Sequence, residues 1–263
     1  MMYNLCFGKD YELHSRVPAL GDIIQHHSPD LICLQEVTPE IHGLLEKSDW
    51  WPEYKCLMSH EMEYYKEAGT VDSNMGGTFS KTKENMGRSY FCMQVVLSEF
   101  QNHGWNSSHF MMINERVAQA KESLMLLGGR GSRNAIFCGD MNWDDKIDGA
   151  FPLSEGWVDA WAELKPGEDG WTYDTEVNAM LSKTSKKLQL RLDRFLCKMP
   201  DFKVQGIEMV GREPIPGGSC VKVDVIRWKS KKKAYWMRRE RTKPVLPSNH
   251  FGLVLTITPQ PGR

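Results

Sequence analysis

The chain has 263 residues, of which 41% are hydrophobic, and this is enough for one substantial buried core, so we expect a single domain. Its 33 basic and 34 acidic residues nearly cancel, so net charge alone gives no indication of a nucleic-acid partner. No apolar run approaches the roughly 18 residues of a membrane span, and no signal peptide opens the chain, so we expect a soluble intracellular protein. The seven cysteines form no Cys-x-x-Cys pair, and we expect them to be reduced thiols rather than a disulfide framework or a zinc site.

The N-terminal part has the pattern of a strand, a helix and a second strand. Residues 2–7 have strand character, and residues 10–27 place apolar side chains at helical spacing despite Pro18 and Gly21. A buried strand is expected at 31–34. Thr38 followed by Pro39 then predicts the start of a helix that ends near Leu45.

The middle of the chain is harder to interpret. Residues 59–112 are rich in Gly, Ser, Lys, Asn and Met, and only 90–97 form a strand candidate. From Asn114 the apolar spacing predicts a helix that leads into a buried strand at 135–138. Further strands are expected at 194–197, 205–210 and 251–257, with a loop at 170–175.

Short polar motifs end or open these apolar runs. They are Tyr3-Asn4, Leu34-Gln35-Glu36, Gly139-Asp140-Met141-Asn142-Trp143, Arg191-Leu192-Asp193-Arg194 and Ser248-Asn249-His250. A rigid sheet can aim carboxylates, carboxamides and an imidazole from strand ends into one crevice. An oxygen-ligand metal site for phosphate chemistry is built in this way.

Asp140 and Asn142 are two residues apart at a strand end, so their side chains point the same way. The carboxylate can orient a water molecule and take its proton, while the carboxamide holds that water or a phosphate oxygen. Gly-Asp-x-Asn is also an ordinary turn sequence, and the motif alone fits either interpretation.

Glu36 follows an unbroken apolar run, where a charge is costly unless it is paired or bound to a cation. A hard oxygen donor suits magnesium, with manganese as the alternative, although a solvated strand end would have the same sequence. His250 precedes a buried strand and could be purely structural. If Asp193 lies beside it, the carboxylate would fix its tautomer and stabilise its cation.

Two further segments are candidates for nucleic-acid contact. The polar loop 170–175 contains Trp171 and Tyr173, which are suited to stacking on exposed bases or to folding back on the core. From Arg227 to Lys243 there are nine Lys or Arg residues against one acid, Glu240, and three aromatic residues are interleaved with them. Such a run could follow phosphates or could simply be solvated.

In this order, the motifs resemble the endonuclease/exonuclease/phosphatase superfamily of metal-dependent phosphodiesterases, and within it the plant-like 5′-tyrosyl-DNA phosphodiesterases. The segments that carry the resemblance are 28–38 (SPDLICLQEVT), 136–145 (IFCGDMNWDD), 170–175 (GWTYDT), 191–195 and 245–250. The resemblance implies a four-layer α/β sandwich, with two mixed β-sheets face to face and helices outside. One catalytic domain over 1–258 is expected, with 59–112 as an atypical segment where the fold would be incomplete and 259–263 as a tail.

The resemblance also implies roles for individual residues. Glu36 would bind magnesium together with Asp140, and Asn4 would support the phosphate site. Asp140 and Asn142 would position or activate the attacking water, and Asp193 would orient His250, which would stabilise the transition state. Trp171, Arg191 and Asn249 would contact substrate DNA. The substrate would be a DNA 5′ end carrying a tyrosyl or protein adduct, and we expect a monomer in the nucleus, with the cytoplasm as the alternative.

Two departures from the family pattern bear on activity. The family carries Ser-Asp-His where this chain has Ser248-Asn249-His250, which removes a carboxylate next to the metal. Its His-Leu-Glu-Ser motif has no counterpart before the helix predicted from Asn114. Three interpretations therefore remain: a tyrosyl-DNA phosphodiesterase, a superfamily enzyme acting on another phosphate ester, or a DNA-end or protein binding module with weakened or lost catalysis.

Overall fold

The computed structural model describes residues 1–6, 12–56, 76–81, 91–95, 109–129, 133–181, 187–230 and 233–260. Two mixed sheets form the body. The larger has the strand order β11-β14-β1-β2-β4-β3, with β1 at Met2–Asn4, β2 at Leu31–Gln35, β3 at Tyr54–Cys56, β4 at Gly76–Lys81, β11 at Phe202–Val210 and β14 at Gly252–Pro259. The smaller has the order β5-β6-β10-β7, with β5 at Phe91–Val95, β6 at Asn134–Asp140, β7 at Val158–Asp159 and β10 at Asp193–Lys198.

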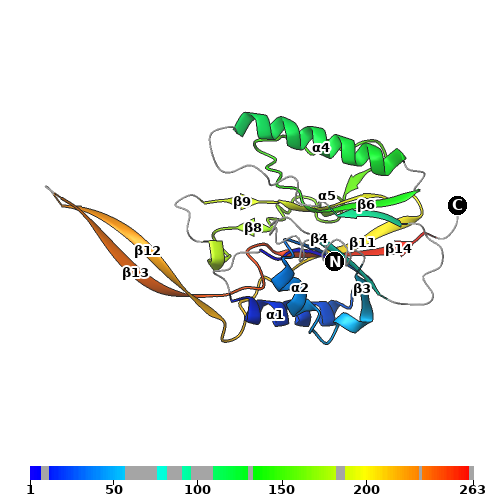
Figure 1. The fold of residues 1–263 in the computed structure, drawn as a ribbon. Coiled ribbons are helices and arrows are strands. Elements are labelled where there is room, and N and C mark those ends of the chain that lie inside the picture. The colour runs from blue at the N-terminus through cyan, green and yellow to red at the C-terminus, as the bar shows by residue number, and fades with distance from the viewer. Residues whose placement is uncertain are drawn as a thin grey trace.

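Helices cover the outer faces of the two sheets (Figure 1). The helices α1 (Leu13–His27) and α2 (Pro39–Leu45) lie on the larger sheet, and α4 (His109–Gly129) lies on the smaller one. A short helix, α5 (Ala160–Leu164), contacts both β10 and β11. The predicted four-layer α/β sandwich is confirmed. No helix among these residues is both long and apolar enough to cross a membrane.

The layers follow from the alternation of side chains along each strand. In β2, Ile32 and Leu34 pack under α1 and α2, while Cys33 faces the opposite sheet. In β6, Phe137 packs under α4 and Cys138 faces inward. Each of these apolar side chains is nearly fully buried, and burial of a Leu, Ile or Phe is worth about 1.5 to 3 kcal/mol. The sequence of a strand that is buried on both faces is therefore a continuous apolar run.

Capping explains where two helices begin and end. Thr38 accepts a hydrogen bond from the Ile41 amide, 3.2 Å between N and Oγ1, and Pro39 occupies the first turn of α2, as predicted. At the other end of α1, Ser28 takes a left-handed conformation and its amide donates to the Ile24 carbonyl. The chain is thereby turned from α1 into β2.

Several predicted bounds differ from the structure. The expected gap in the fold at 59–112 contains β4, which pairs with both β2 and β3, so the larger sheet is continuous there. The helix predicted from Asn114 begins at His109. The predicted loop 170–175 contains a short strand, β8 (Tyr173–Asp174), which pairs with β9 (Gln189–Leu190) farther along the chain. The strand predicted at 90–97 is β5, whereas residues 59–75, 82–90 and 96–108 lie outside the described ranges.

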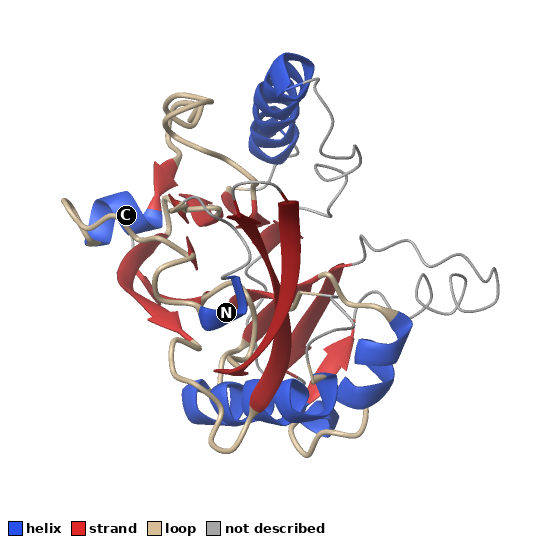
Figure 2. Ribbon diagram, turned by 90° about the vertical axis from the view of Figure 1, so that its left-hand side faces the viewer, coloured by secondary structure: helices blue, strands red, loops and turns tan. Residues whose placement is uncertain are grey.

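The basic run forms part of a long hairpin that the sequence analysis did not predict. Strand β12 (Ser219–Ser230) pairs antiparallel with β13 (Lys233–Pro244) along their whole length. The hairpin projects from one end of the sandwich (Figure 1), and the view from that end shows its twisted strands in front of the body (Figure 2). Neither strand pairs with any other strand that the structure describes.

Candidate active site

The sheet registers bring the polar motifs to one end of the sandwich. Strands β1 and β2 are parallel, with Asn4 opposite Gln35, so Asn4 and Glu36 emerge together. In the smaller sheet, Asp193 at the start of β10 lies opposite Asp140 at the end of β6. His250 precedes β14, which pairs with β1. Five segments far apart in sequence therefore meet at one point.

Asn4 joins the two candidate metal-binding carboxylates. Its Nδ2 donates to Glu36 Oε1 at 2.9 Å and to Asp140 Oδ2 at 3.0 Å, while its Oδ1 accepts from the Cys6 amide. Glu36 is 8% exposed and Asp140 is 4% exposed, so neither charge is well hydrated. The Asn4 amide is neutral, so the two buried carboxylates that it joins lie close together, an arrangement that a bound cation would stabilise.

The donor set fits magnesium. Within the described ranges, no group of three or more His, Cys, Asp or Glu side chains surrounds a metal position. Magnesium does not require such a cage, because it keeps several waters and is held by one or two carboxylates together with substrate phosphates. Glu36 and Asp140 supply two such carboxylates, and one oxygen of each lies within hydrogen-bonding distance of Asn4 Nδ2.

Asp140 is held in place from several sides. Its amide donates to Gln35 Oε1 at 2.8 Å, and its Oδ1 accepts from the Asn142 amide at 2.9 Å. Burial raises the pKa of Asp140 to about 6, although the nearby His250 opposes this shift. At neutral pH the group is therefore mostly ionised, and it is a stronger base than an ordinary aspartate.

His250 forms an ion pair with Asp193, 2.9 Å between Nδ1 and Oδ2, and its Nε2 lies 3.9 Å from Asp140 Oδ2. Burial alone would lower the pKa of His250, but the charges of Asp193 and Asp140 outweigh it and raise the pKa to about 9. The imidazole is therefore protonated at neutral pH, with Nε2 on the side of the carboxylate cluster. The ring of Tyr173 packs edge-on against it, with centroids 5.2 Å apart.

Two of the site residues have unusual backbone conformations. Glu36 has a φ of 58° and Asn142 a φ of 48°, both in the left-handed region that non-glycine residues rarely adopt. Each follows the end of a buried strand, where the surrounding hydrogen bonds fix the chain. Such strain is often found at functional sites, and here both residues are hydrogen-bonded to the cluster, Glu36 through its side chain and Asn142 through its amide.

Asn142 also carries a donor with no protein partner. Its Nδ2 is buried and donates no hydrogen bond to any residue that the structure describes. A buried unpaired amide costs roughly 1 to 3 kcal/mol, so a ligand oxygen that accepted this hydrogen bond would recover that energy. The atom is a natural contact for a phosphate oxygen or a bound water.

The structure does not bring every predicted residue into this cluster. Arg191 Nη1 donates to both carboxylate oxygens of Asp159, each at 2.7 Å, in a partly buried ion pair. Trp171 is partly exposed, in the loop before Thr172. Asn249 is also partly exposed, and its Oδ1 lies 3.3 Å from Ser248 Oγ.

Positioning residues that sequence reasoning did not single out complete the site. Ser248 Oγ donates to the Asn4 carbonyl at 2.6 Å and accepts from the His250 amide. Thr172 Oγ1 accepts from the Asp193 amide, and its carbonyl accepts from the Phe251 amide. Ser248 and Gln35 lie inside the noted motifs, so their sequence positions were a usable signal, whereas Thr172 carries no signal beyond its place next to Trp171.

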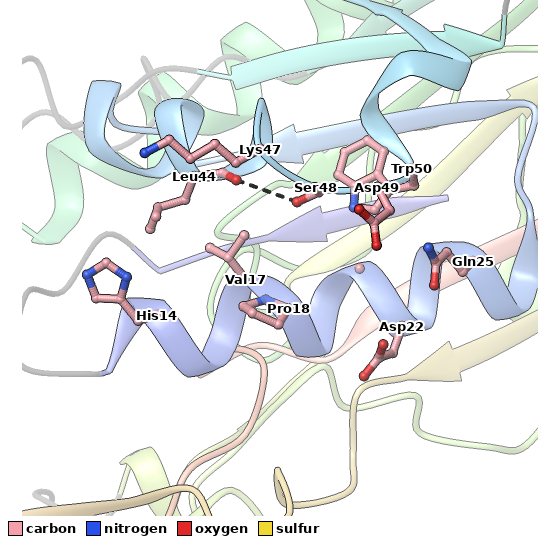
Figure 3. A pocket seen from close by; sticks show the side chains of 11 residues that line it. His14, Val17, Pro18, Asp22, Gln25, Leu44, Lys47, Ser48, Asp49 and Trp50 are labelled. Atoms are coloured by element: carbon pink, nitrogen blue, oxygen red, sulfur yellow. Dashed lines mark hydrogen bonds between the residues drawn. The ribbon is translucent and has the colours of Figure 1, made fainter.

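A cavity of about 370 Å³ elsewhere on the molecule lacks this chemistry. It lies between α1 and the segment that follows α2, and its polar lining includes His14, Asp22, Gln25, Lys47 and Asp49 (Figure 3). His14 and Gln25 are at opposite ends of the row of α1 residues in that view. The polar groups are spread along a helix instead of converging, so the carboxylate cluster remains the candidate site.

Comparisons with known proteins identify the family of the chain. The family model described as Endonuclease/Exonuclease/phosphatase family matches residues 3–219. The chain is similar to tyrosyl-DNA phosphodiesterase 2 of Homo sapiens, with 28% identity over 195 residues that cover 69% of this chain and 52% of that protein. It is similar to the same protein of Bos taurus, with 26% identity over 256 residues that cover 88% of this chain and 59% of that protein. The chain thus spans between about half and three-fifths of the length of these relatives.

A solved structure shares the fold. The crystal structure of D. rerio TDP2 complexed with single strand DNA product has a TM-score of 0.69 and 17% sequence identity, and the match covers 98% of this chain and 97% of that one. Another crystal structure, of Caenorhabditis elegans TDP2, gives a TM-score of 0.65 at 16% identity, with 96% of this chain and 72% of that one covered. At these identities, the likeness concerns the fold.

Proposed function

The chain belongs to the Endonuclease/Exonuclease/phosphatase family, and from that membership we propose that it is a magnesium-dependent phosphodiesterase that hydrolyses the bond between a tyrosine and a 5′ DNA phosphate. Such a reaction would release a trapped topoisomerase from a DNA end. The similarity to tyrosyl-DNA phosphodiesterase 2 supports this substrate, and a nuclear location would follow from it.

The observation that carries the proposal is the meeting of an acidic pair with a charged imidazole. Glu36 and Asp140 share one amide donor, and the protonated His250 stands beside Asp140. A negatively charged phosphodiester needs positive charge around its oxygens and a base for the attacking water. The cluster offers the cation-binding carboxylates, the base and the imidazolium together.

The geometry supports a role for each residue of the cluster. Glu36 and Asp140 would hold magnesium, which would neutralise phosphate charge and polarise the ester. Asp140 would take a proton from the attacking water, and Asn142 Nδ2 would hold that water or a phosphate oxygen. The water oxygen bonds to phosphorus, and the tyrosine oxygen leaves with the electrons of its bond. His250, oriented through Nδ1 by Asp193, would donate from Nε2 to the charge that develops on the phosphoryl group.

Turnover of a 5′-phosphotyrosyl oligonucleotide, with magnesium and with a chelator, tests the function. We expect free tyrosine and 5′-phosphorylated DNA only when magnesium is present. Hydrolysis of simple phosphodiesters or phosphomonoesters without cleavage of this substrate would assign the site to another reaction. Binding of the DNA end without hydrolysis of any phosphate ester would identify a binding module.

We expect Trp171→Ala to act on DNA binding and not on the chemical step. Loss of one stacking aromatic should weaken binding by about 1 to 3 kcal/mol, which would raise KM for an oligonucleotide while the single-turnover rate at saturation stays near that of the wild type. Trp51→Ala, which removes another partly buried tryptophan on the far side of the larger sheet, is the matched control. A lower saturating rate with unchanged binding would contradict the assignment of Trp171.

We expect Asn249→Asp to raise activity more at limiting than at saturating magnesium. An added anionic oxygen on the residue that precedes His250 should strengthen the binding of a hard divalent ion. It should also favour the protonated form of His250, since an opposite charge nearby raises the pKa of an imidazole. Rates measured across a magnesium titration check this. Equal rates for the two proteins at every magnesium concentration would exclude position 249 from the working site.

A further inference from the structure

The charge of this chain is segregated. Residues 219 to 244 hold ten Lys or Arg and two acids, so this segment is net +8 in a chain whose net charge is −1, and the rest of the chain is net −9. The positive segment is the β12–β13 hairpin. The match to the family model ends at residue 219, where β12 begins, so the family model does not cover this hairpin.

Cations and aromatic residues occupy paired positions along the hairpin. In the half of the hairpin nearer the body, Lys222 lies opposite Arg241, and toward the tip Arg227 lies opposite Trp236. The next pair is Trp228 opposite Tyr235. Basic residues with interleaved aromatics are the composition of surfaces that follow a nucleic-acid backbone. A two-stranded β-ribbon is also one of the two elements that the major groove of B-DNA admits.

The base of the hairpin is fixed close to the candidate active site. The Ile215 amide donates to the Val245 carbonyl at 2.8 Å, and the Val245 amide donates to the Gly218 carbonyl at 3.4 Å. Val245 and Leu246 are buried beside Phe251, and Ser248 is tied to Asn4. The path from the hairpin to His250 is therefore short and well packed, and the hairpin leaves the body at the end where β8 and β9 lie (Figure 1).

The reach of the hairpin matches a DNA duplex. Each strand has 12 residues, which at about 3.3 Å per residue extends roughly 40 Å. One turn of B-DNA is about 34 to 36 Å long. We propose that the β12–β13 hairpin is an arm that binds the phosphate backbone of duplex DNA adjoining the 5′ end held in the active site. The proposal rests on the proposed function for the identity of that DNA, while the binding itself can be measured without catalysis.

The test compares two charge-neutralised proteins. Arg238→Gln, Arg239→Gln and Arg241→Gln together remove three cations from β13. Lys47→Gln, Lys55→Gln and Lys121→Gln together remove three exposed cations from the body and serve as the control. Binding of each protein to an unmodified duplex of about two helical turns is measured by fluorescence anisotropy in a chelator, over a range of salt concentrations.

We expect the arm variant to bind the duplex at least about tenfold more weakly near physiological salt, with a slope of log affinity against log salt reduced by about 2 to 3. The control should change affinity less than about twofold. Equal losses in the two variants, or an unchanged salt slope in the arm variant, would overturn the proposal. If the arm variant melts early, exchange of residues 222–241 for an Asn-Gly turn gives the same comparison.

A catalytic readout separates this proposal from the proposed function. On a 5′-phosphotyrosyl duplex, the arm variant should show a higher KM, whereas on a tyrosyl ester of a single nucleotide it should match the wild type, because so short a substrate does not reach the arm. If the wild-type protein hydrolyses neither substrate but binds the duplex through the arm, the result contradicts the proposed function and leaves the arm proposal standing. If both substrates are hydrolysed and the arm variant has the same KM as the wild type, the result contradicts the arm proposal.

Discussion

Asp140→Asn is expected to lower the single-turnover rate on a phosphotyrosyl substrate by about 100 to 10,000-fold, the usual contribution of a positioned general base. Asparagine keeps the size of the side chain, and its oxygen can still accept from the Asn142 amide, as Oδ1 of Asp140 does at 2.9 Å. It removes the basic oxygen beside His250. Quenched-flow measurement at saturating enzyme and magnesium isolates the chemical step.

Asp22→Asn, on the exposed side of α1, is the matched control and should leave the rate unchanged. A melting curve of the Asp140 variant distinguishes a lost base from a lost fold. The proposed roles require Asp140→Asn to lower the single-turnover rate and Trp171→Ala to weaken DNA binding. A variant of Asp140 that bound DNA poorly but reacted at the wild-type rate would reverse them.

Glu36→Gln is expected to abolish metal-dependent turnover while the protein stays folded. Glutamine can keep the hydrogen bond that Glu36 Oε1 accepts from Asn4, but it carries no charge for the cation. Since a bound metal contributes several kcal/mol to the stabilisation of the transition state, the loss should be about 1,000-fold or more at a fixed magnesium concentration. Titration calorimetry with magnesium alone should show weaker binding. Retention of the wild-type rate at saturating magnesium would remove Glu36 as the ligand.

Glu163→Gln, an exposed substitution of the same kind on α5, is the control for Glu36. The Asp140→Asn and Glu36→Gln variants also differ from each other in a measurable way. Excess magnesium should partly restore a variant whose only defect is cation affinity, whereas it should not restore one that lacks the base. This contrast assigns the separate contributions of the two carboxylates that Asn4 joins.

Much of the site could be predicted because its chemistry lies at the ends of strongly apolar strands. Glu36 and Asp140 each follow such a run, and their side chains meet through Asn4. The pairing of Asp193 with His250 was predicted only as a hypothesis, since nothing local in a sequence specifies a contact across 57 positions; the structure confirms the contact at 2.9 Å. Their catalytic roles remain predictions.

Other parts could not be predicted for physical reasons. Strand β4 (Gly76–Lys81) is rich in small and polar residues, and its place is set by pairing with β2 and β3, which local propensity does not encode. Strand β12 did contain a signal, the alternation of Val221, Val223 and Val225 with polar residues, but the charge of the segment obscured it. The ion pair of Arg191 with Asp159 also has no local signal in the sequence, because the two residues lie 32 positions apart; contact of Arg191 with DNA stays a prediction.

The left-handed backbone at Glu36 and Asn142 has a consequence for how this protein can be stabilised. A non-glycine residue in that region costs of order 1 to 3 kcal/mol, and glycine would relieve the cost. The same exchange would delete the carboxylate or the carboxamide that the strained turn presents. Under the roles proposed above, a selection for heat resistance would favour glycine at these two positions and enrich proteins of lower activity, so thermostability and catalysis would oppose each other there.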